Sequence, residues 1–281
     1  MKTLYISDLD GTLLNPDAEL SSYTIQTIND LIGKGMNFTV ATARSAASAV
    51  HILKDLHLTL PIVLMNGVLI YDIPARQYIR IEYLSPETLA FIYKVLNDFE
   101  LTGFLYEVKD NMLSTYYETL ENQAQIEFLS ERVNKYRKVF TKVESFTQVE
   151  QSHLIYLSLL NTKKRLEGAY QILKTRKDIG LAYYRDVYSK EEMWYLEIFS
   201  HKATKYNAVQ YLRNTYHFDK IIGFGDNLND LPLFQACDIT CAVANAKEEL
   251  KKYANYITES NINNGVAEWL RRNYSDVHLS L

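Results

Sequence analysis

Short apolar runs alternate along the first part of the chain with segments whose apolar residues recur every three or four positions. The first pattern predicts buried strands and the second predicts amphipathic helices. We therefore expect strands at residues 4–6, 37–41, 61–65, 68–71 and 77–83, and helices at residues 23–34 and 45–56. Strands that alternate with helices form a parallel sheet covered on both faces.

The pattern changes near residue 85, where the apolar runs become weaker. Helices are expected there at residues 86–99, 118–135 and 163–176, with strands at residues 103–107, 112–115, 153–160 and 179–184. This order is typical of an α+β domain built on a small sheet. We predict that residues 85–187 form an inserted domain, and that its linkers, which lack Gly/Ser runs, act as a hinge.

Strand–helix alternation resumes after the insertion, with strands at residues 194–199, 220–224, 239–243 and 256–258 and helices at residues 204–216 and 265–273. The predicted fold class is α/β. A Rossmann-like parallel-sheet core would comprise residues 1–84 and 188–281, interrupted by the inserted α+β domain. The 281 residues suit two domains, because single cores rarely grow beyond about 250 residues.

Charge and composition narrow the classes of partner. The formal net charge of −4 argues against a nucleic-acid surface as the main role. A run of about 18 apolar residues, which a membrane span needs, does not occur, and we expect a soluble cytoplasmic protein, monomeric or homodimeric. Cys237 and Cys241 stand without a neighbouring His or third Cys, so core packing is favoured over metal binding or a disulfide.

Polar side chains follow four of the predicted strands, where the carboxyl ends of parallel strands share one edge and ligands bind. They are Asp8 with Asp10, Thr42, Lys205, and Asp226 with Asn229 and Asp230. Gly11 would let the chain turn, so that the first two carboxylates converge outside the sheet. Two aspartates beside a glycine are also common in ordinary turns, so this pair alone leaves both interpretations open.

Converging carboxylates repel one another, and a divalent cation relieves that repulsion. Mg²⁺ binds carboxylate oxygens together with water and a substrate phosphate. A carboxylate nucleophile, a hydroxyl, a lysine and Mg²⁺ together make a phosphoryl-transfer site, in which positioning and charge neutralisation dominate. An aspartate can accept the phosphoryl group, and a second carboxylate can serve as general acid and base.

The motifs Asp-Leu-Asp-Gly-Thr-Leu at 8–13, Thr-Ala-Arg at 42–44 and Gly-Asp-Asn-Leu-Asn-Asp at 225–230 resemble those of the haloacid dehalogenase superfamily. The likeness is closest to its Cof-type phosphatases (class IIB), which carry a large C2B cap. Asn66-Gly67 and residues 243–246 and 264–267 are also similar to that group. The resemblance covers the whole core, whereas the cap resembles the group by position and length.

The resemblance implies roles for residues at matching positions. Asp8 would be the nucleophile and a Mg²⁺ ligand, and Asp10 the general acid/base with its backbone carbonyl on the metal. Thr42, beside Ala43, would bind phosphoryl oxygens, and Lys205 would neutralise their charge. The remaining implied roles are Asp226 as a Mg²⁺ ligand, Asn229 near the phosphate, and Asp230 on the metal or its water.

Some positions depart from the family pattern or leave a choice. Lys205 is preferred to Lys202 because the family lysine lies just inside the following helix. Ala43 and Tyr206 stand where glycine is usual. Arg44 either meets substrate or pairs with a loop carboxylate, and the second interpretation is favoured.

The cap is expected to select the leaving group. Candidates lie at the end of a cap strand: Tyr183, Tyr184, Arg185 and Asp186. Arg185 could anchor a second anionic group, although a solvated arginine at a strand end explains it equally well.

The leading hypothesis is a Mg²⁺-dependent phosphatase that hydrolyses small phosphate monoesters through an aspartyl phosphate. Sugar phosphates are the first expected substrates, followed by phosphorylated cofactors such as pyridoxal phosphate or FMN. Two alternatives remain: a phosphosugar mutase, and a non-turnover phospho-acceptor or binding protein. Asp10 argues against the phospho-acceptor, because a general acid/base beside the nucleophile promotes turnover.

Overall fold

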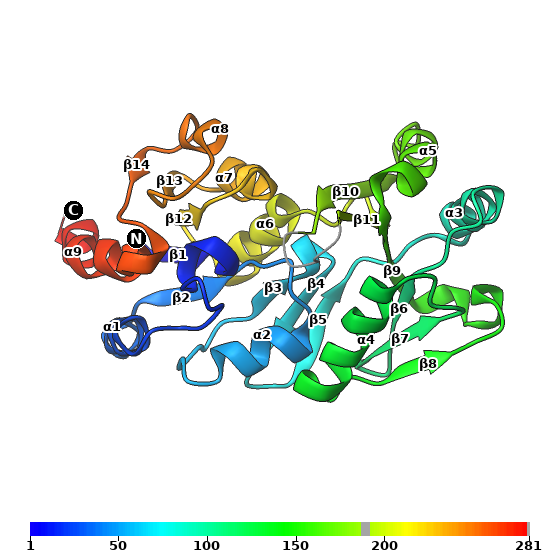
Figure 1. Cartoon of the computed structure of the whole chain (residues 1–281). Coiled ribbons are helices and arrows are strands. Elements are labelled where there is room, and N and C mark those ends of the chain that lie inside the picture. Colours follow the sequence, from blue (N-terminus) through cyan, green and yellow to red (C-terminus); the bar gives the residue numbers. More distant parts are fainter. Residues whose placement is uncertain (187–191, 280–281) are drawn as a thin grey trace. The chain divides into compact units, whose positions relative to one another are not determined.

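A computed structural model describes residues 1–186 and 192–279 (Figure 1). The chain divides into two compact units. The first, here called the core unit, comprises Met1–Arg80 and Thr204–Leu281. The second, the inserted unit, comprises Ile81–Ala203. The inserted unit thus interrupts the core unit in the sequence.

The core unit contains a five-stranded sheet in the order β14-β13-β12-β1-β2, in which every neighbouring pair is parallel. Its strands are β1 (Thr3–Ser7), β2 (Asn37–Val40), β12 (Lys220–Gly225), β13 (Ile239–Ala242) and β14 (Tyr256–Ile257). Ser7 pairs with both Phe224 and Val40. β12, β1 and β2 consequently end at the same level, and the residues that follow them meet at one edge.

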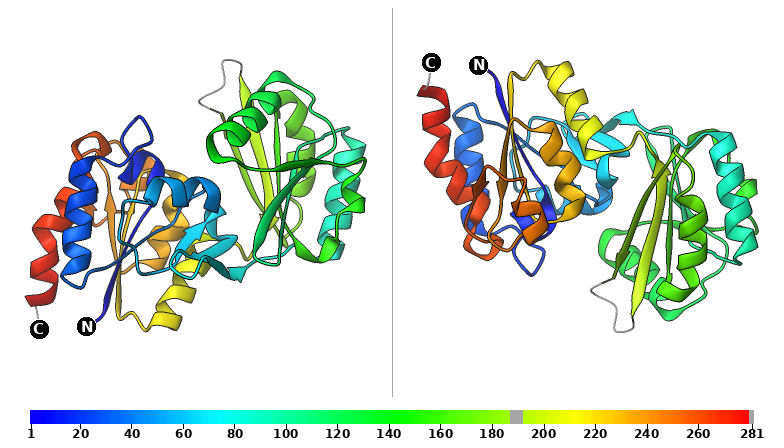
Figure 2. Two further views of the ribbon diagram at one scale, coloured as in Figure 1. Left: turned by 90° about the horizontal axis from the view of Figure 1, so that it is seen from below. Right: turned by 90° about the horizontal axis from the view of Figure 1, so that it is seen from above.

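Helices cover both faces of this sheet. α1 (Ser22–Gly33) packs beside α9 (Gly265–Leu279) on one face, as both views of Figure 2 show. α6 (Lys205–Tyr216) packs on α7 (Leu231–Ala236) against the other face. The remaining helices of this unit are α2 (Ala46–Leu53) and the short α8 (Glu248–Lys251). The predicted α/β fold class is confirmed.

A smaller three-stranded sheet follows α2 in the core unit. It consists of β3 (Ile62–Leu64), β4 (Leu69–Asp72) and β5 (Gln77–Ile81) in that order. A parallel bridge between Ala41 and Val63 places β3 beside the end of β2. The tight turn η2 (Met65–Gly67) then reverses the chain into β4.

The inserted unit is a six-stranded sheet in the order β10-β11-β9-β6-β7-β8, mostly antiparallel. Leucines of the sheet and of two helices form the core on one face, including Leu89, Leu157 and Leu166. On the other face Phe128 stacks on Phe104 with ring centroids 4.6 Å apart. The strands are β6 (Phe104–Lys109), β7 (Met112–Tyr117), β8 (Phe140–Lys142), β9 (Leu154–Thr162), β10 (Ile179–Arg185) and β11 (Met193–Ser200), and the helices are α3 (Pro86–Asp98), α4 (Gln123–Tyr136) and α5 (Lys163–Leu173).

The return from the insertion differs from the sequence-based boundary. The predicted junction between residues 187 and 188 lies outside the described residues. Residues 194–199, which the sequence assigned to the parallel core, belong to β11, which pairs antiparallel with β9 and β10 of the inserted unit. Apolar residues in β11 face the leucine core of that unit, and such a run looks the same in either sheet when only the sequence is read.

Local signals explain several helix starts. The Ser21 hydroxyl accepts a hydrogen bond from the Thr24 amide, and Ser85 caps α3 in the same way ahead of Pro86. Asn122 caps α4, which begins at Gln123 rather than at residue 118 as predicted. None of the described helices has the length and apolar character needed to cross a membrane.

Candidate active site

Three carboxylates meet at the carboxyl edge of the parallel sheet. Asp8 follows β1, Asp226 follows β12, and Asp230 ends the short turn after Asp226; carboxylate oxygens of all three lie within 4.8 Å of one another. The Asp8 amide donates to the Phe224 carbonyl at 2.9 Å. This hydrogen bond continues the pairing of β1 with β12 and places Asp8 beside the end of β12. The structure thus brings together three of the carboxylates that the sequence placed at this edge, whereas Asp10, which was expected to converge with Asp8, pairs with Arg44.

Gly11 makes the approach of the two loops possible. Its φ of +75° suits glycine, and a Cβ at this position would lie 2.4 Å from Asp226 Oδ2. Thr12, one residue later, donates its hydroxyl to Asp226 Oδ1 at 3.0 Å. Thr12 was not assigned a role from the sequence, although it lies inside the motif that carried the resemblance.

Lys205 lies within the acidic cluster. Its ammonium is 2.5 Å from Asp8 Oδ1 and 2.7 Å from Asp230 Oδ1, and its side chain is 1% exposed. Thr204 caps α6 through the Asn207 amide, which places Lys205 at the first helical position. Lys202 is exposed, so the geometry agrees with the choice of Lys205 over Lys202.

Burial and mutual repulsion perturb the acids. Burial raises the pKa of Asp8 well above its usual value, and Asp230 and Asp226 add to the rise while Lys205 opposes it. Burial, followed by the charge of Asp230, raises the pKa of Asp226 to about 6. Burial disfavours the Lys205 ammonium, but Asp230 and Asp8 outweigh it and keep the Lys205 pKa above its usual value. Three acids share one lysine, so the cluster has an excess of negative charge.

Asp230 is fully buried, and both its oxygens accept hydrogen bonds. Oδ1 accepts from Lys205, whereas Oδ2 accepts from the backbone amides of Asp226 at 3.0 Å and Asn227 at 3.2 Å. This arrangement is a capping box at the start of the turn. Asp230 therefore orients the Asp226 loop and the Lys205 ammonium.

Asp10 points to a different partner from the other acids. Its carboxylate forms a two-point ion pair with Arg44, at 2.8 Å from Nε to Oδ2 and 2.6 Å from Nη2 to Oδ1. Arg44 also donates to Ser48 Oγ at 2.8 Å. The expected pairing of Arg44 with a loop carboxylate is thus observed, and the carboxylate is that of the predicted general acid.

The remaining predicted residues occupy varied positions. Thr42 is fully buried beside Val63, and its hydroxyl accepts the Arg44 amide at 3.1 Å, which leaves the hydroxyl hydrogen available for donation. Ala43 and Asn229 are exposed in the core unit. Arg185 is exposed on β10 of the inserted unit.

A family model for haloacid dehalogenase-like hydrolases matches residues 5–270. The chain belongs to this family. Its Cof-type resemblance and its assignment as a hydrolase are thereby confirmed.

Similar proteins span almost the whole chain. The chain is 27% identical over 285 residues to the 5-amino-6-(5-phospho-D-ribitylamino)uracil phosphatase YwtE of Bacillus subtilis, a match that covers 96% of this chain and 97% of that protein. It is 22% identical over 280 residues to the pyridoxal phosphate phosphatase YbhA of Escherichia coli, covering 94% and 95% respectively. A haloacid dehalogenase-like hydrolase structure from Bacteroides thetaiotaomicron shares the fold, with a TM-score of 0.78, 20% identity and coverage of 97% and 99%.

Two asparagines hold the acidic loop of this haloacid dehalogenase-like hydrolase. Asn245 Nδ2 donates to the Gly11 carbonyl at 2.7 Å, and Asn261 Nδ2 donates to the Leu14 carbonyl at 2.9 Å. The Asn261 amide also donates to Asn245 Oδ1 at 2.9 Å, which joins the two supports. Asn245 lies in one of the additional segments that resembled the family, and its contact gives that likeness a physical reason.

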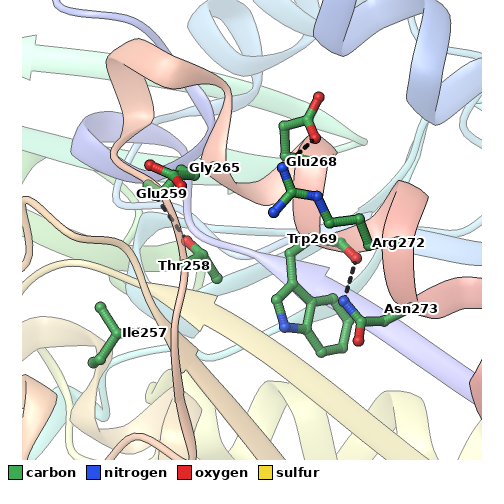
Figure 3. A pocket seen from close by; sticks show the side chains of 8 residues that line it. All are labelled: Ile257, Thr258, Glu259, Gly265, Glu268, Trp269, Arg272 and Asn273. Carbon is green, nitrogen blue, oxygen red and sulfur yellow. Dashed lines mark hydrogen bonds and ion pairs between the residues drawn. The ribbon is translucent and has the colours of Figure 1, made fainter.

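A pocket of about 220 Å³ lies beside β14 and α9, and its lining includes none of the predicted site residues (Figure 3). Glu268 lies beside Arg272 there, 3.1 Å from its guanidinium, and Trp269 packs edge-on against Phe224. Its lining is Ile257, Thr258, Glu259, Gly265, Glu268, Trp269, Arg272 and Asn273. None of these residues bears the phosphoryl-transfer chemistry predicted from the motifs.

Proposed function

We propose that this haloacid dehalogenase-like hydrolase is a Mg²⁺-dependent phosphatase of small phosphate monoesters. The observation that carries the proposal is the Asp8 carboxylate, which is buried with Lys205 on one side and Asp226 nearby. Two relatives are phosphatases of a phosphoribitylamino-uracil and of pyridoxal phosphate, which supports a small phosphorylated metabolite as substrate.

The donor set suits a hard divalent cation. The clustered groups are carboxylate oxygens. Burial, followed by the charge of Asp230, raises the pKa of Asp226, and a bound cation would relieve the repulsion between these carboxylates. Asp8 and Asp226 would hold the ion, with the Asp10 backbone carbonyl as a further donor. Asp230 has both oxygens engaged and would orient Asp226 and Lys205. When bound, the ion would neutralise charge on phosphoryl oxygens.

The proposed reaction has two steps at Asp8. An Asp8 oxygen attacks phosphorus, the ester P–O bond breaks, and the leaving oxygen takes a proton from Asp10. Water then attacks the phosphorus of phospho-Asp8 and passes its proton to Asp10, which releases phosphate and restores the carboxylate. Lys205 and the Thr42 hydroxyl stabilise charge on phosphoryl oxygens. The proposed acid step requires the Asp10 carboxyl to release its ion pair with Arg44.

We assign the choice of leaving group to the inserted unit. The residues proposed to contact the leaving group lie on opposite faces of β10. Tyr183 stacks on Tyr170 of α5, with centroids 4.4 Å apart, whereas the Tyr184 hydroxyl donates to Glu197 at 3.0 Å. Neighbouring strand residues point to opposite faces, so Tyr183 and Tyr184 cannot serve one ligand together. Tyr184 and Asp186 therefore share one face, and Tyr183 and Arg185 share the other.

Phosphate release from a panel of phosphorylated sugars, nucleotides and cofactors tests the function directly. We expect release with Mg²⁺ and none after EDTA treatment. Rapid release from phosphorylated proteins and slow release from every small ester would contradict the proposed substrate class.

The replacement Asp10→Asn should have an effect that depends on the leaving group. An alkyl phosphate needs a proton on its leaving oxygen, whereas p-nitrophenolate leaves without one. We expect kcat to fall about 10³-fold on an alkyl phosphate and about tenfold on p-nitrophenyl phosphate. Arg44→Gln breaks the same ion pair but keeps the carboxylate, so its effect should not depend on the leaving group. Equal losses on both substrates in Asp10→Asn would remove Asp10 from the acid role.

Metal binding should stabilise the protein more at neutral pH than in acid. The pKa of Asp226 is raised from 3.8 to about 6, so the metal-free fold loses stability as pH rises through this range and the group ionises. Mg²⁺ binds the ionised group and removes that cost. With about 10 mM Mg²⁺ the rise in Tm should be at least about twice as large near pH 7.5 as near pH 5. Asp226→Asn should abolish most of the rise, and equal rises at both pH values in the native chain would refute the assignment.

A further inference from the structure

The turn between β3 and β4 has an unusual backbone. Met65, Asn66 and Gly67 have φ values of 49°, 56° and 105°, so three consecutive residues occupy the left-handed region. Residues other than glycine seldom adopt this region, and they keep it where surrounding contacts impose it. The contacts of this turn lead to two parts of the proposed active site.

The first contact holds the loop that carries Thr42. The Asn66 amide donates to the Thr42 carbonyl at 3.0 Å, and the Met65 amide donates to the Arg44 carbonyl at 3.1 Å. The Thr42 amide in turn donates to the Val63 carbonyl at 2.9 Å. The backbone of β3 and its turn therefore fixes the position of the Thr42 hydroxyl.

The second contact is with the start of α6. A Cβ on Gly67 would lie 2.3 Å from the Thr204 carbonyl oxygen and 3.0 Å from the Lys205 amide nitrogen. These are backbone atoms, which cannot rotate away as the end of a side chain can. The same Thr204 carbonyl accepts the Ala208 amide at 3.1 Å, so the first helical turn holds it in place.

We propose that Gly67 is a positioning residue for Lys205. Its missing side chain lets the turn seat directly on the first residue of α6, and this contact sets where the ammonium meets Asp8 and Asp230. The buried Lys205 side chain has little freedom to compensate for a displaced helix start, because its ammonium already contacts two carboxylates. The inference rests on the proposed function of Asp8 and Lys205.

The replacement Gly67→Ala tests the proposal. We expect kcat to fall at least tenfold while KM changes less than threefold, because Lys205 stabilises charge that develops during the reaction. Gly35→Ala is the matched control, since Gly35 also has a positive φ, +93°, but open space where its Cβ would be. Gly35→Ala therefore reports the cost of left-handed alanine without the clash, and it should retain native kcat. A native kcat in folded Gly67→Ala would overturn the proposal.

A double-mutant cycle connects Gly67 to the lysine. If the displacement acts through Lys205, then Gly67→Ala added to Lys205→Met should change kcat less than threefold beyond Lys205→Met alone. Multiplicative losses would overturn the proposal, since Gly67 would then act independently of the lysine. If Lys205→Met itself left kcat unchanged, the proposed function would fail, which is distinguishable from failure at Gly67 alone.

A second variant covers the possibility that Gly67→Ala fails to fold. Asn66→Gly keeps the left-handed backbone and the amide that contacts Thr42, and it removes a side chain whose Oδ1 is buried without a hydrogen-bond partner among the described residues. If the backbone of the turn positions Lys205, then Asn66→Gly should have a kcat within threefold of the native value. A loss above tenfold in folded Asn66→Gly would assign the effect to the Asn66 carboxamide and overturn the proposal.

Discussion

Asp8→Asn is expected to abolish phosphate release, with kcat lowered on the order of 10⁴-fold or more, because the carboxamide cannot form the phosphoryl-enzyme bond. Its stability without metal should be retained or increased. Burial and two neighbouring carboxylates raise the pKa of Asp8, so the ionised side chain is costly in the metal-free fold and a neutral one is not. Lys205 keeps its second ion pair with Asp230 in this variant.

Steady-state phosphate release and thermal denaturation of the same samples measure both effects. Asp17→Asn is a matched control, because Asp17 undergoes the same chemical change in an exposed loop. Cold acid quenching of the native enzyme during turnover should trap a protein-bound phosphate that hydroxylamine releases and that Asp8→Asn lacks. Trapped phosphate on the Asp8→Asn protein, or turnover of this variant within tenfold of the native value, would refute Asp8 as the nucleophile.

The sequence was sufficient for the acidic cluster because parallel topology constrains strand ends. Once β1 and β12 are neighbours in register, Asp8 and Asp226 must meet at one edge. The choice of Lys205 over Lys202 rested instead on the resemblance, because the family lysine lies just inside the following helix, and the structure places Lys205 at the first helical position behind Thr204. The first inference uses the geometry of a regular sheet, whereas the second needed the family pattern.

Other features depend on partners that are distant in the sequence. The run at residues 194–199 has the apolar character of a core strand, but the pairing of β11 with β9 places it in the inserted unit. The close approach of Gly67 to Thr204 joins segments more than a hundred residues apart, and Asn66-Gly67 alone indicates a turn but no neighbour. The opposite directions of Tyr183 and Tyr184, in contrast, were readable from strand alternation.

The Asp10–Arg44 pair lies between these cases. Both residues are in the motifs, and an ion pair between them is chemically natural. The resemblance implies an acid role for Asp10, and the sequence indicated a loop carboxylate as the partner of Arg44 without naming it. The structure shows that this carboxylate is that of Asp10.

Lys205→Met should damage stability and turnover together. Its removal leaves Asp8 and Asp230 buried without their shared cation, and breaking a buried pair in this way costs about 3–5 kcal/mol near neutral pH. We expect kcat to fall about 10²–10³-fold, because the fixed Lys205 ammonium no longer stabilises the negative charge on the phosphoryl oxygens. The stability loss should be smaller near about pH 5, since Asp8, whose pKa burial raises well above its usual value, then takes up a proton and loses its charge.

Unfolding of the core unit can be followed selectively. In a Trp194→Phe background Trp269, which packs against Phe224, is the remaining tryptophan and reports this unit. Lys202→Met is the matched control, because it removes an exposed lysine three positions earlier and should leave both stability and kcat near native values. Mg²⁺ should restore part of the stability lost in Lys205→Met, since a bound cation again balances the buried carboxylates. Equal destabilisation by the two replacements, or a loss that does not vary with pH, would show that the Lys205 ammonium does not balance the acidic cluster.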